Sequence, residues 1–206
     1  MTLSENSDII FLMEEKLKQK EVALATILSK GLDSKTCDLI LDSAGDFKKS
    51  IINSKSTGYD SHKIRKVQTF FDNQKWVYDL IWPIMEGANK AAEWEFKIES
   101  AEHYQISKYE IGEFYNWHMD GLGTQGTKYT DKTKPDIDGK TRKISMSLIL
   151  NDDFEGGDLV FWQQGGVKQE KGSLIFFPSF IPHQVTPVTK GIRYSLVMWF
   201  LGKPWR

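Results

Sequence analysis

The stretch YEIGEFYNWHMD, residues 109–120, decides how the rest of this chain is read. It combines strand-favouring aromatic residues with a glycine that indicates a turn. Successive side chains of a β-strand point to opposite faces, so His118 and Asp120, two positions apart, point to the same side. A histidine and a carboxylate held in this way supply two of the three donors of a 2-His-1-carboxylate site. Such a site leaves part of the metal open for non-haem Fe(II) oxygen chemistry.

A third donor and a cation follow in the order that such a site needs. His183 opens a short strand-like run after residues 178–182, and Arg193 starts the last run, ten positions further on. The planar guanidinium of Arg193 could bind the carboxylate of an acidic co-substrate, because it keeps its charge when buried. Taken singly, His118 could be a strand-end residue bonded to backbone, and Arg193 could be the partner of a surface carboxylate. The ordered set is what predicts a metal site.

Other polar residues have weaker signals. Tyr109 and Ser195 could add hydroxyl donors to a carboxylate held by Arg193, although packing within a strand explains them equally well. His62 and His103 lack partners of this kind, so we expect them to be surface or packing residues.

After about residue 96 the chain changes to short runs rich in β-branched and aromatic residues, punctuated by glycines. The runs predicted as strands are 104–109, 115–118, 143–150, 158–162, 173–177 and 192–201. Many short strands at this spacing are typical of a barrel or a two-sheet jelly roll. Four aromatic residues in or near these runs are expected in the core or along a substrate groove: Tyr115, Trp117, Trp162 and Trp199.

The first 95 residues have mainly helical periodicity. Residues 7–20 predict a short amphipathic helix. A better-defined helix begins near Asp33, where Asp33 or Ser34 can cap it, and Gly45 can end it. A longer helix is predicted over 74–92, with a kink or break at Pro83 because proline removes a backbone donor.

No hinge separates the two halves of the chain. We therefore predict a single α+β domain over residues 1–206, in which residues 1–95 support a jelly-roll core of residues 96–206. Between residues 119 and 142 lies a polar, glycine- and lysine-rich stretch. A loop of this length is usually functional or disordered. The sequence therefore allows two interpretations, an active-site lid and a loop without a role in function.

Composition narrows the class of protein. Hydrophobic residues make up 40% and aromatic residues 13% of 206, which favours a folded globule. The net charge of -1 gives no support for sequence-independent nucleic-acid binding. The single Cys37 excludes an internal disulfide framework and fits a reducing compartment. No apolar run near Met1 is long enough for a signal sequence or a membrane span, so we expect a cytoplasmic protein.

The motifs also resemble a known family. Residues 109–120 resemble the Tyr-x-x-Gly-x-x-Tyr-x-x-His-x-Asp segment of the prolyl 4-hydroxylase-like branch of the Fe(II)/2-oxoglutarate-dependent dioxygenase superfamily. Residues 155–159 (EGGDL) resemble its Gly-Gly turn, and residues 173–178 (SLIFFP) resemble the strand before its distal histidine. Residues 183–193 resemble the segment that carries this histidine and the co-substrate cation. The resemblance covers about residues 94–201, and the chain is similar in size to small bacterial and phage members.

The resemblance implies a double-stranded β-helix (jelly roll) with the metal between its two sheets. His118, Asp120 and His183 would bind Fe(II), which 2-oxoglutarate would chelate through its 1-carboxylate and 2-keto oxygens. The 5-carboxylate of 2-oxoglutarate would meet Arg193 and Tyr109.

Three further points follow from the resemblance. Trp199, six residues after Arg193, stands where some members place an aromatic residue near the co-substrate. Collagen-type prolyl hydroxylases have lysine at the position of Arg193, so the arginine resembles the oxygen-sensing and small bacterial branches and argues against a collagen-like substrate. Asp120 favours hydroxylation, because halogenating relatives lack this carboxylate.

The implied reaction consumes O2 and 2-oxoglutarate, releases succinate and CO2, and adds one oxygen atom to a substrate, with ascorbate as an assay reductant.

The expected substrate is a prolyl residue in a peptide or protein, because aromatic residues could line a groove for an extended chain. One alternative is a free amino acid or other small molecule, which a closed pocket with a second cationic clamp would favour. Another is a non-catalytic jelly-roll binding module. Nucleic-acid demethylation fits less well because no second downstream arginine is evident, and a structural metal site would close its coordination sphere. The oligomeric state stays open.

Overall fold

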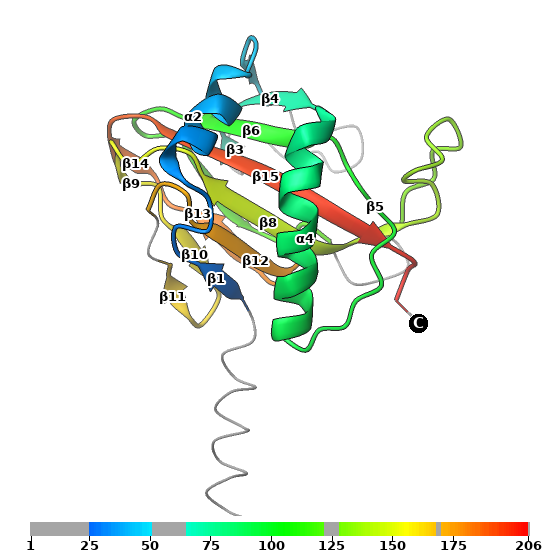
Figure 1. Ribbon diagram of the computed structural model, residues 1–206. Helices are drawn as coiled ribbons and strands as arrows, with labels where there is room; N and C mark the ends of the chain where they lie inside the picture. The colour runs from blue at the N-terminus through cyan, green and yellow to red at the C-terminus, as the bar shows by residue number, and fades with distance from the viewer. Residues whose placement is uncertain (1–24, 51–64, 122–127, 168–169, 206) are drawn as a thin grey trace, which may run out of the picture.

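The computed structural model describes residues 25–50, 65–121, 128–167 and 170–205. Its strands form two main sheets that face each other, and two helices cover the outer face of the larger sheet (Figure 1). The larger sheet has the order β1 (Thr26–Leu28), β12 (Leu174–Pro178), β8 (Thr141–Ile149), β15 (Arg193–Gly202), β6 (Tyr104–Tyr109), β4 (Gln68–Asp72), β2 (Lys48–Lys49), with β5 (Ser100–Ala101) also on β15.

The smaller sheet completes the jelly roll. Its order is β11 (Gly165–Gly166), β10 (Leu159–Phe161), β13 (His183–Val185), β7 (Phe114–His118), β3 (Arg65–Lys66). A third, two-stranded sheet pairs β14 (Val188–Lys190) with β9 (Glu155–Gly156). All these pairings are antiparallel, and the predicted α+β jelly-roll class is confirmed.

Strand β15 separates the helical layer from the space between the sheets. Its residues Arg193, Ser195, Val197 and Trp199 line a cavity between the sheets. The alternate residues Leu196, Met198 and Phe200 are fully buried in the core beneath the helices. This two-residue alternation is the reason why one strand can serve both a hydrophobic core and a polar site.

Helix α2 (Ser34–Asp42) begins where the sequence predicted. The Asp33 side chain caps it by accepting a hydrogen bond of 2.9 Å from the Thr36 amide. The predicted end at Gly45 is wrong, because the helix ends at Asp42. Gly45 instead packs against Phe70, where a Cβ atom would lie 2.9 Å from the aromatic ring.

Helix α4 (Lys75–Ala91) runs through Pro83 as one element, so of the predicted kink or break the break is wrong and the kink stays a prediction. Pro83 and Asp79, whose carbonyl loses its partner, both lie on the exposed side of the helix. Water can bond to that carbonyl there, which lowers the cost of the missing backbone hydrogen bond. The apolar face, with Val77, Ile81 and Met85 fully buried, holds the helix against the larger sheet.

The first 95 residues contain more strand than predicted. Strands β1, β2, β3 and β4 were missed, because most are only two or three residues long and their pairing partners are distant in the sequence. The predicted helix over 7–20 lies outside the described residues. The six predicted strands after residue 96 are confirmed, with ends shifted by two residues at most. Among the helices that the structure describes, none has the length and apolarity to cross a membrane.

Candidate metal and co-substrate site

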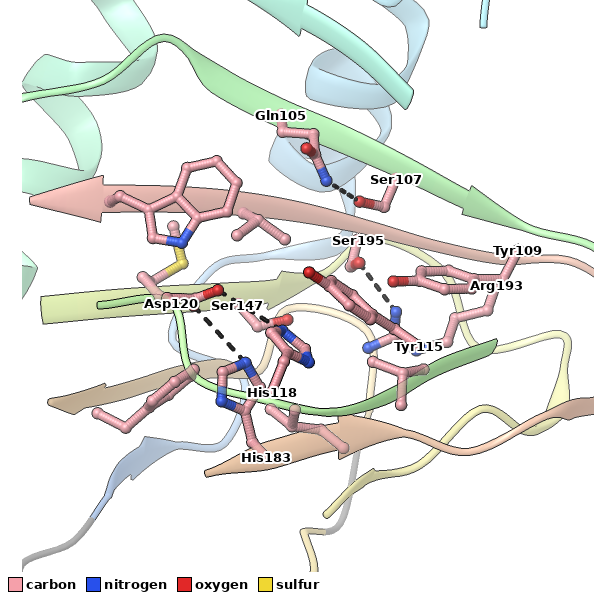
Figure 2. Close-up of a pocket in the computed structure, with 16 residues that line it drawn as sticks. Gln105, Ser107, Tyr109, Tyr115, His118, Asp120, Ser147, His183, Arg193 and Ser195 are labelled. Atoms are coloured by element: carbon pink, nitrogen blue, oxygen red, sulfur yellow. Dashed lines mark hydrogen bonds and ion pairs between the residues drawn. The ribbon is translucent and has the colours of Figure 1, made fainter. Parts of the chain in front are cut away.

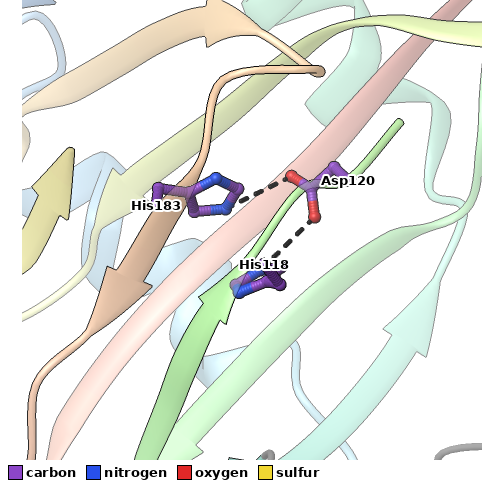
Figure 3. A group of neighbouring side chains, drawn as sticks. All are labelled: His118, Asp120 and His183. Carbon is purple, nitrogen blue, oxygen red and sulfur yellow. Dashed lines mark ion pairs between the residues drawn. The ribbon is translucent and has the colours of Figure 1, made fainter. Parts of the chain in front are cut away.

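The three predicted metal ligands come together between the sheets. His118 Nε2 lies 3.6 Å from Asp120 Oδ1, and His183 Nε2 lies 3.6 Å from Asp120 Oδ2. One ligand atom from each residue lies within 4.8 Å of the others, so a single ion could contact all three (Figure 3). Two imidazoles and one carboxylate on one side of an ion leave the opposite side open, and this donor set fits Fe(II).

The backbone orients both imidazole rings toward the same point. Nδ1 of His118 lies 2.7 Å from the Asn116 carbonyl, and Nδ1 of His183 lies 2.9 Å from the Ile181 carbonyl. A carbonyl only accepts, so each Nδ1 carries the proton and each Nε2 presents its lone pair to the site. Burial lowers the pKa of His183, which also favours the neutral ring that a metal requires.

A β-bulge in β7 positions His118. His183 pairs with His118, but Val185 pairs with Tyr115, so Asn116 and Trp117 together oppose the single residue Gln184. Because of this extra residue, Tyr115 and His118 both face the cavity although they are three positions apart. Their rings stack with centroids 3.5 Å apart and planes 8° apart.

Asp120 is held in its ionised form by its surroundings. Burial alone would raise its pKa, but His183, His118 and Arg142 outweigh that effect and hold the pKa well below its usual range. Arg142 also donates from Nη1 to the Asp120 carbonyl at 3.3 Å. The aspartate is therefore fixed through both its side chain and its backbone.

Arg142 is a site residue that sequence reasoning missed. Its guanidinium binds Glu102 in a two-pronged ion pair with distances of 2.5 and 2.7 Å, and it lies 3.9 Å from the centre of a ring of Trp199. Tyr129 donates a further hydrogen bond of 2.8 Å to Glu102. Glu102 and Arg142 are 40 positions apart, so no local pattern links them.

Arg193 lies in the same cavity as the three ligands (Figure 2). Its side chain is 1% exposed, and Nη1 donates to Ser195 Oγ at 2.9 Å. Arg193 is paired with Tyr109 across β15 and β6, and the guanidinium lies 5.4 Å from the centre of the Tyr109 ring. Burial raises the pKa of Tyr109 to about 12, so its hydroxyl stays protonated and can donate to an anion.

The Gly-Gly turn seen in the sequence contacts Arg193. Gly157 has φ of +64°, and a Cβ atom there would lie 2.7 Å from Arg193 Cδ. Gly156, at φ of +71°, leaves no room either, because its Cβ would lie 2.5 Å from the Pro187 carbonyl oxygen. Both glycines are therefore required by backbone conformation and by close approach.

Trp199 also lines this cavity and is 8% exposed. Its Nε1–H is buried without an acceptor in the described parts of the chain. An orphaned donor beside a cation and a metal-ligand set fits a bound molecule with carboxylate oxygens, as 2-oxoglutarate would be. The open volume is about 50 Å³, and the Tyr115 ring lies over His118 in the same cavity (Figure 2). We expect a five-carbon diacid to displace this half-buried ring.

Other predictions have different outcomes. His103 lies outside the cavity, 3.5 Å from the Asn73 amide, and His62 lies outside the described residues. Trp117 and Trp162 are not core residues: they are 41% and 54% exposed and contact each other edge to face. Within the 119–142 stretch, residues 128–140 form turns and Tyr129 bonds to Glu102. No described contact of this stretch tests whether it acts as a lid.

Comparisons with known proteins agree with this geometry. Residues 104–201 match the sequence model of the 2OG-Fe(II) oxygenase superfamily. A PKHD-type hydroxylase of Idiomarina loihiensis is 35% identical over 99 residues, and one of Shewanella sp. strain MR-7 is 34% identical over 100. Each match covers 46% of this chain. The chain spans about two fifths of these relatives' own length, at 39% and 40%.

Solved structures show the same fold at low sequence identity. The viral collagen prolyl hydroxylase of Paramecium bursaria Chlorella virus-1 has a TM-score of 0.64 and 18% identity, covering 87% of this chain and 96% of its own. A Pseudomonas putida prolyl-4-hydroxylase has a TM-score of 0.61 and 20% identity, covering 88% and 97%. Residues 104–201 therefore match the sequence model of the 2OG-Fe(II) oxygenase superfamily, and the chain has the jelly-roll fold of these solved structures, with the three candidate ligands grouped between its sheets.

Proposed function

We propose that the protein is an Fe(II)- and 2-oxoglutarate-dependent dioxygenase that hydroxylates a prolyl residue in a peptide or protein. The observation that carries this proposal is one cavity containing both His118, Asp120 and His183 and the buried Arg193. Bound there, Fe(II), 2-oxoglutarate and O2 supply the oxidising chemistry, with succinate and CO2 as by-products. The curated relatives are called PKHD-type hydroxylases, and solved structures of this fold include prolyl hydroxylases.

Different residues of the cavity would bind the metal and the co-substrate. His118, Asp120 and His183 would hold Fe(II) through two neutral nitrogens and one carboxylate oxygen. Arg193 would bind the far carboxylate of 2-oxoglutarate. Its charge is retained although burial lowers its pKa, because arginine starts from a very high value.

Three neighbours would complete the co-substrate site. Tyr109 and Ser195 would present hydroxyl groups beside the guanidinium, and Trp199 would present its unpaired indole N–H. The apolar rings of Phe177 and Phe161 pack against the imidazole of His183 and would keep water from the part of the ring that they cover.

The lining of the cavity favours a peptide or protein over a free amino acid. Among the described residues that line it, Arg193 is the only arginine or lysine. If Arg193 binds the co-substrate, no second cation is left in the cavity for the carboxylate of a free amino acid. A small-molecule substrate is therefore the weaker candidate, and a non-catalytic module is weaker still because every expected ligand is present.

The proposal is tested by turnover and by metal binding. Purified protein with Fe(II), 2-oxoglutarate, ascorbate and proline-containing peptides should release succinate and give a product heavier by one oxygen atom. His183→Ala should lose both turnover and stoichiometric metal binding, whereas His103→Ala, outside the cavity, should keep both. Wild-type protein that binds no divalent metal would refute the proposal.

Two finer points belong to the same proposal. Ascorbate is expected to sustain turnover by keeping iron reduced, and omitting it should shorten the progress curve. We place the activity in the cytoplasm, because the one cysteine, Cys37, is buried and free and fits a reducing compartment.

A further inference from the structure

A second cavity lies outside the metal site, near the end of β15. It has a volume of about 410 Å³ and is lined by Glu95, Phe96, Lys97, Glu99, Lys143, Lys203, Pro204 and Trp205. Glu95, Lys97, Glu99 and Lys203 are exposed residues at its rim. Of its charged residues only Lys143 is buried, at 6% exposed.

In the parts of the chain that the structure describes, Lys143 has no carboxylate partner. No described Asp or Glu oxygen lies within 4.0 Å of its ammonium group, whose contact is the face of the Trp205 ring, 3.3 Å from the centroid. Burial is the only cause that acts on its pKa, which it lowers. Buried lysines are normally paired, so an ammonium facing a cavity without an anion indicates a missing partner.

Trp205 provides a second donor without an acceptor. Its Nε1–H is buried and has no partner in the described residues. The ring is fixed edge to face by Phe96 and by Phe180, at centroid distances of 4.9 and 5.6 Å. An oxyanion in the cavity would satisfy the Trp205 donor and the Lys143 ammonium together.

The charge around the cavity is compatible with an anion. Glu99 at the rim lies 3.9 Å from Lys140 and 4.0 Å from Lys203, so its charge is offset. Glu95 has no such partner among the residues that the structure describes, but it is exposed and screened by solvent. The buried part of the cavity is therefore positive.

The cavity lies close to the metal site along β8. Lys143 and Ser147 are both in this strand, four residues and therefore about 13 Å apart, and a bulge at Lys143 interrupts the regular alternation of side chains there. Ser147 lines the metal cavity. Phe180, which packs on Trp205, is three residues before the predicted ligand His183 in the same turn. The two cavities are neighbours along the sheet, at a separation of about four residues of extended peptide.

From this arrangement we infer that the second cavity binds a carboxylate of the peptide whose proline lies at the metal, through Lys143 and Trp205. This inference rests on the proposed function, and it names the substrate class as prolyl chains with an acidic group roughly three to five residues from the target. The carboxylate can come from an Asp or Glu side chain or from the peptide C-terminus.

The test compares matched peptides. A proline peptide is synthesised with Glu or Gln at each position about two to five residues from the proline, on both sides, and with a free or amidated C-terminus. The Glu peptide at the right position should have kcat/KM about tenfold higher than its Gln partner, mainly through KM. Preference for a free terminus instead would identify the terminal carboxylate as the source.

Variants assign the preference to the cavity. Lys143→Met should remove the acidic preference and leave turnover of the Gln peptide unchanged, which also shows that the variant folds. Trp205→Phe, which keeps a ring but not the N–H, should reduce the preference in part. Lys203→Met, at the exposed rim, should retain it. Equal kcat/KM for Glu and Gln peptides, or a preference that survives in Lys143→Met, overturns the inference.

Binding separates this inference from the proposed function. If no peptide is hydroxylated, the prolyl hydroxylase proposal fails, and fluorescence anisotropy of the labelled peptides then decides on the cavity. Tighter binding of Glu than of Gln peptides, lost in Lys143→Met, supports the carboxylate site. Equal binding overturns it.

Discussion

Gly157 and Arg193 are in contact beside the cavity that His118, Asp120 and His183 line, where a methyl group on Gly157 would lie 2.7 Å from Arg193 Cδ. The guanidinium can reach its observed position only because residue 157 has no side chain. The Gly-Gly turn therefore sets the position of a side chain from another strand, β15.

Gly157→Ala should weaken 2-oxoglutarate binding by displacing Arg193. We expect KM for 2-oxoglutarate to rise about tenfold or more, measured by succinate release. Gly139→Ala is the matched control, because Gly139 also has positive φ, +73°, but its Cβ would meet nothing within 4 Å. An equal change in both variants would show that backbone strain, not contact with Arg193, is responsible.

Arg193→Lys tests whether the planar fork is needed. Lysine keeps the charge but cannot bind a carboxylate through two parallel hydrogen bonds, so KM for 2-oxoglutarate should rise by about tenfold, and further for Arg193→Met. An unchanged KM in the lysine variant would mean that a positive charge at this position is sufficient and that the planar guanidinium is not required.

The hydroxyl of Tyr109 should act as a donor that does not depend on pH. Its pKa is raised to about 12, so the group stays protonated throughout the range in which the protein is assayed. Tyr109→Phe should therefore raise KM for 2-oxoglutarate by the same factor at each pH from about 6 to 9. A loss that fades toward the alkaline end would contradict a neutral donor.

Tyr115 should leave its stacked position when 2-oxoglutarate binds. The ring lies over His118 in a cavity of about 50 Å³, too small for the co-substrate as it stands. With Zn(II) as a diamagnetic ion, NMR of the Tyr115 ring should show a large shift on addition of 2-oxoglutarate and none with succinamide, which has no charge. Unchanged resonances at saturating co-substrate would place 2-oxoglutarate elsewhere.

Glu102→Gln should destabilise the fold, because it leaves the Arg142 guanidinium without its anion. The pair is only 20% and 16% exposed, so we expect a loss of roughly 1–3 kcal/mol in the free energy of unfolding, measured with urea. Asp79→Asn breaks the exposed Lys75–Asp79 pair on α4 and should have no measurable effect. Similar losses of unfolding free energy in both variants would show that the Glu102–Arg142 pair contributes no more to stability than the exposed Lys75–Asp79 pair.

The parts of the site that could be predicted are those set by local sequence. His118 and Asp120 are two residues apart and do lie together, but the predicted strand placement holds only for His118, because β7 ends there and Asp120 lies in the bend that follows. The position of Arg193 at the start of a strand could also be predicted, from the strand-like run of residues 192–201. The strand runs after residue 96 were visible because their apolar residues alternate or cluster between glycines.

The parts that could not be predicted depend on pairing between distant segments. The partnership of Glu102 with Arg142 joins residues 40 positions apart, and Lys143 meets Trp205 only because the chain end folds over β8. Short strands such as β2 and β3 have too few residues to show a period. Their extended form comes from β4 and β7 beside them.

The bulge at Asn116 and Trp117 has a consequence for how the strand pattern of this motif is interpreted. On a regular strand, Tyr115 and His118, three positions apart, would point to opposite faces of the sheet. The extra residue puts both side chains on the cavity side against β13. An assignment based on strict alternation would therefore place one of the two residues on the solvent side, although they share one wall of the cavity.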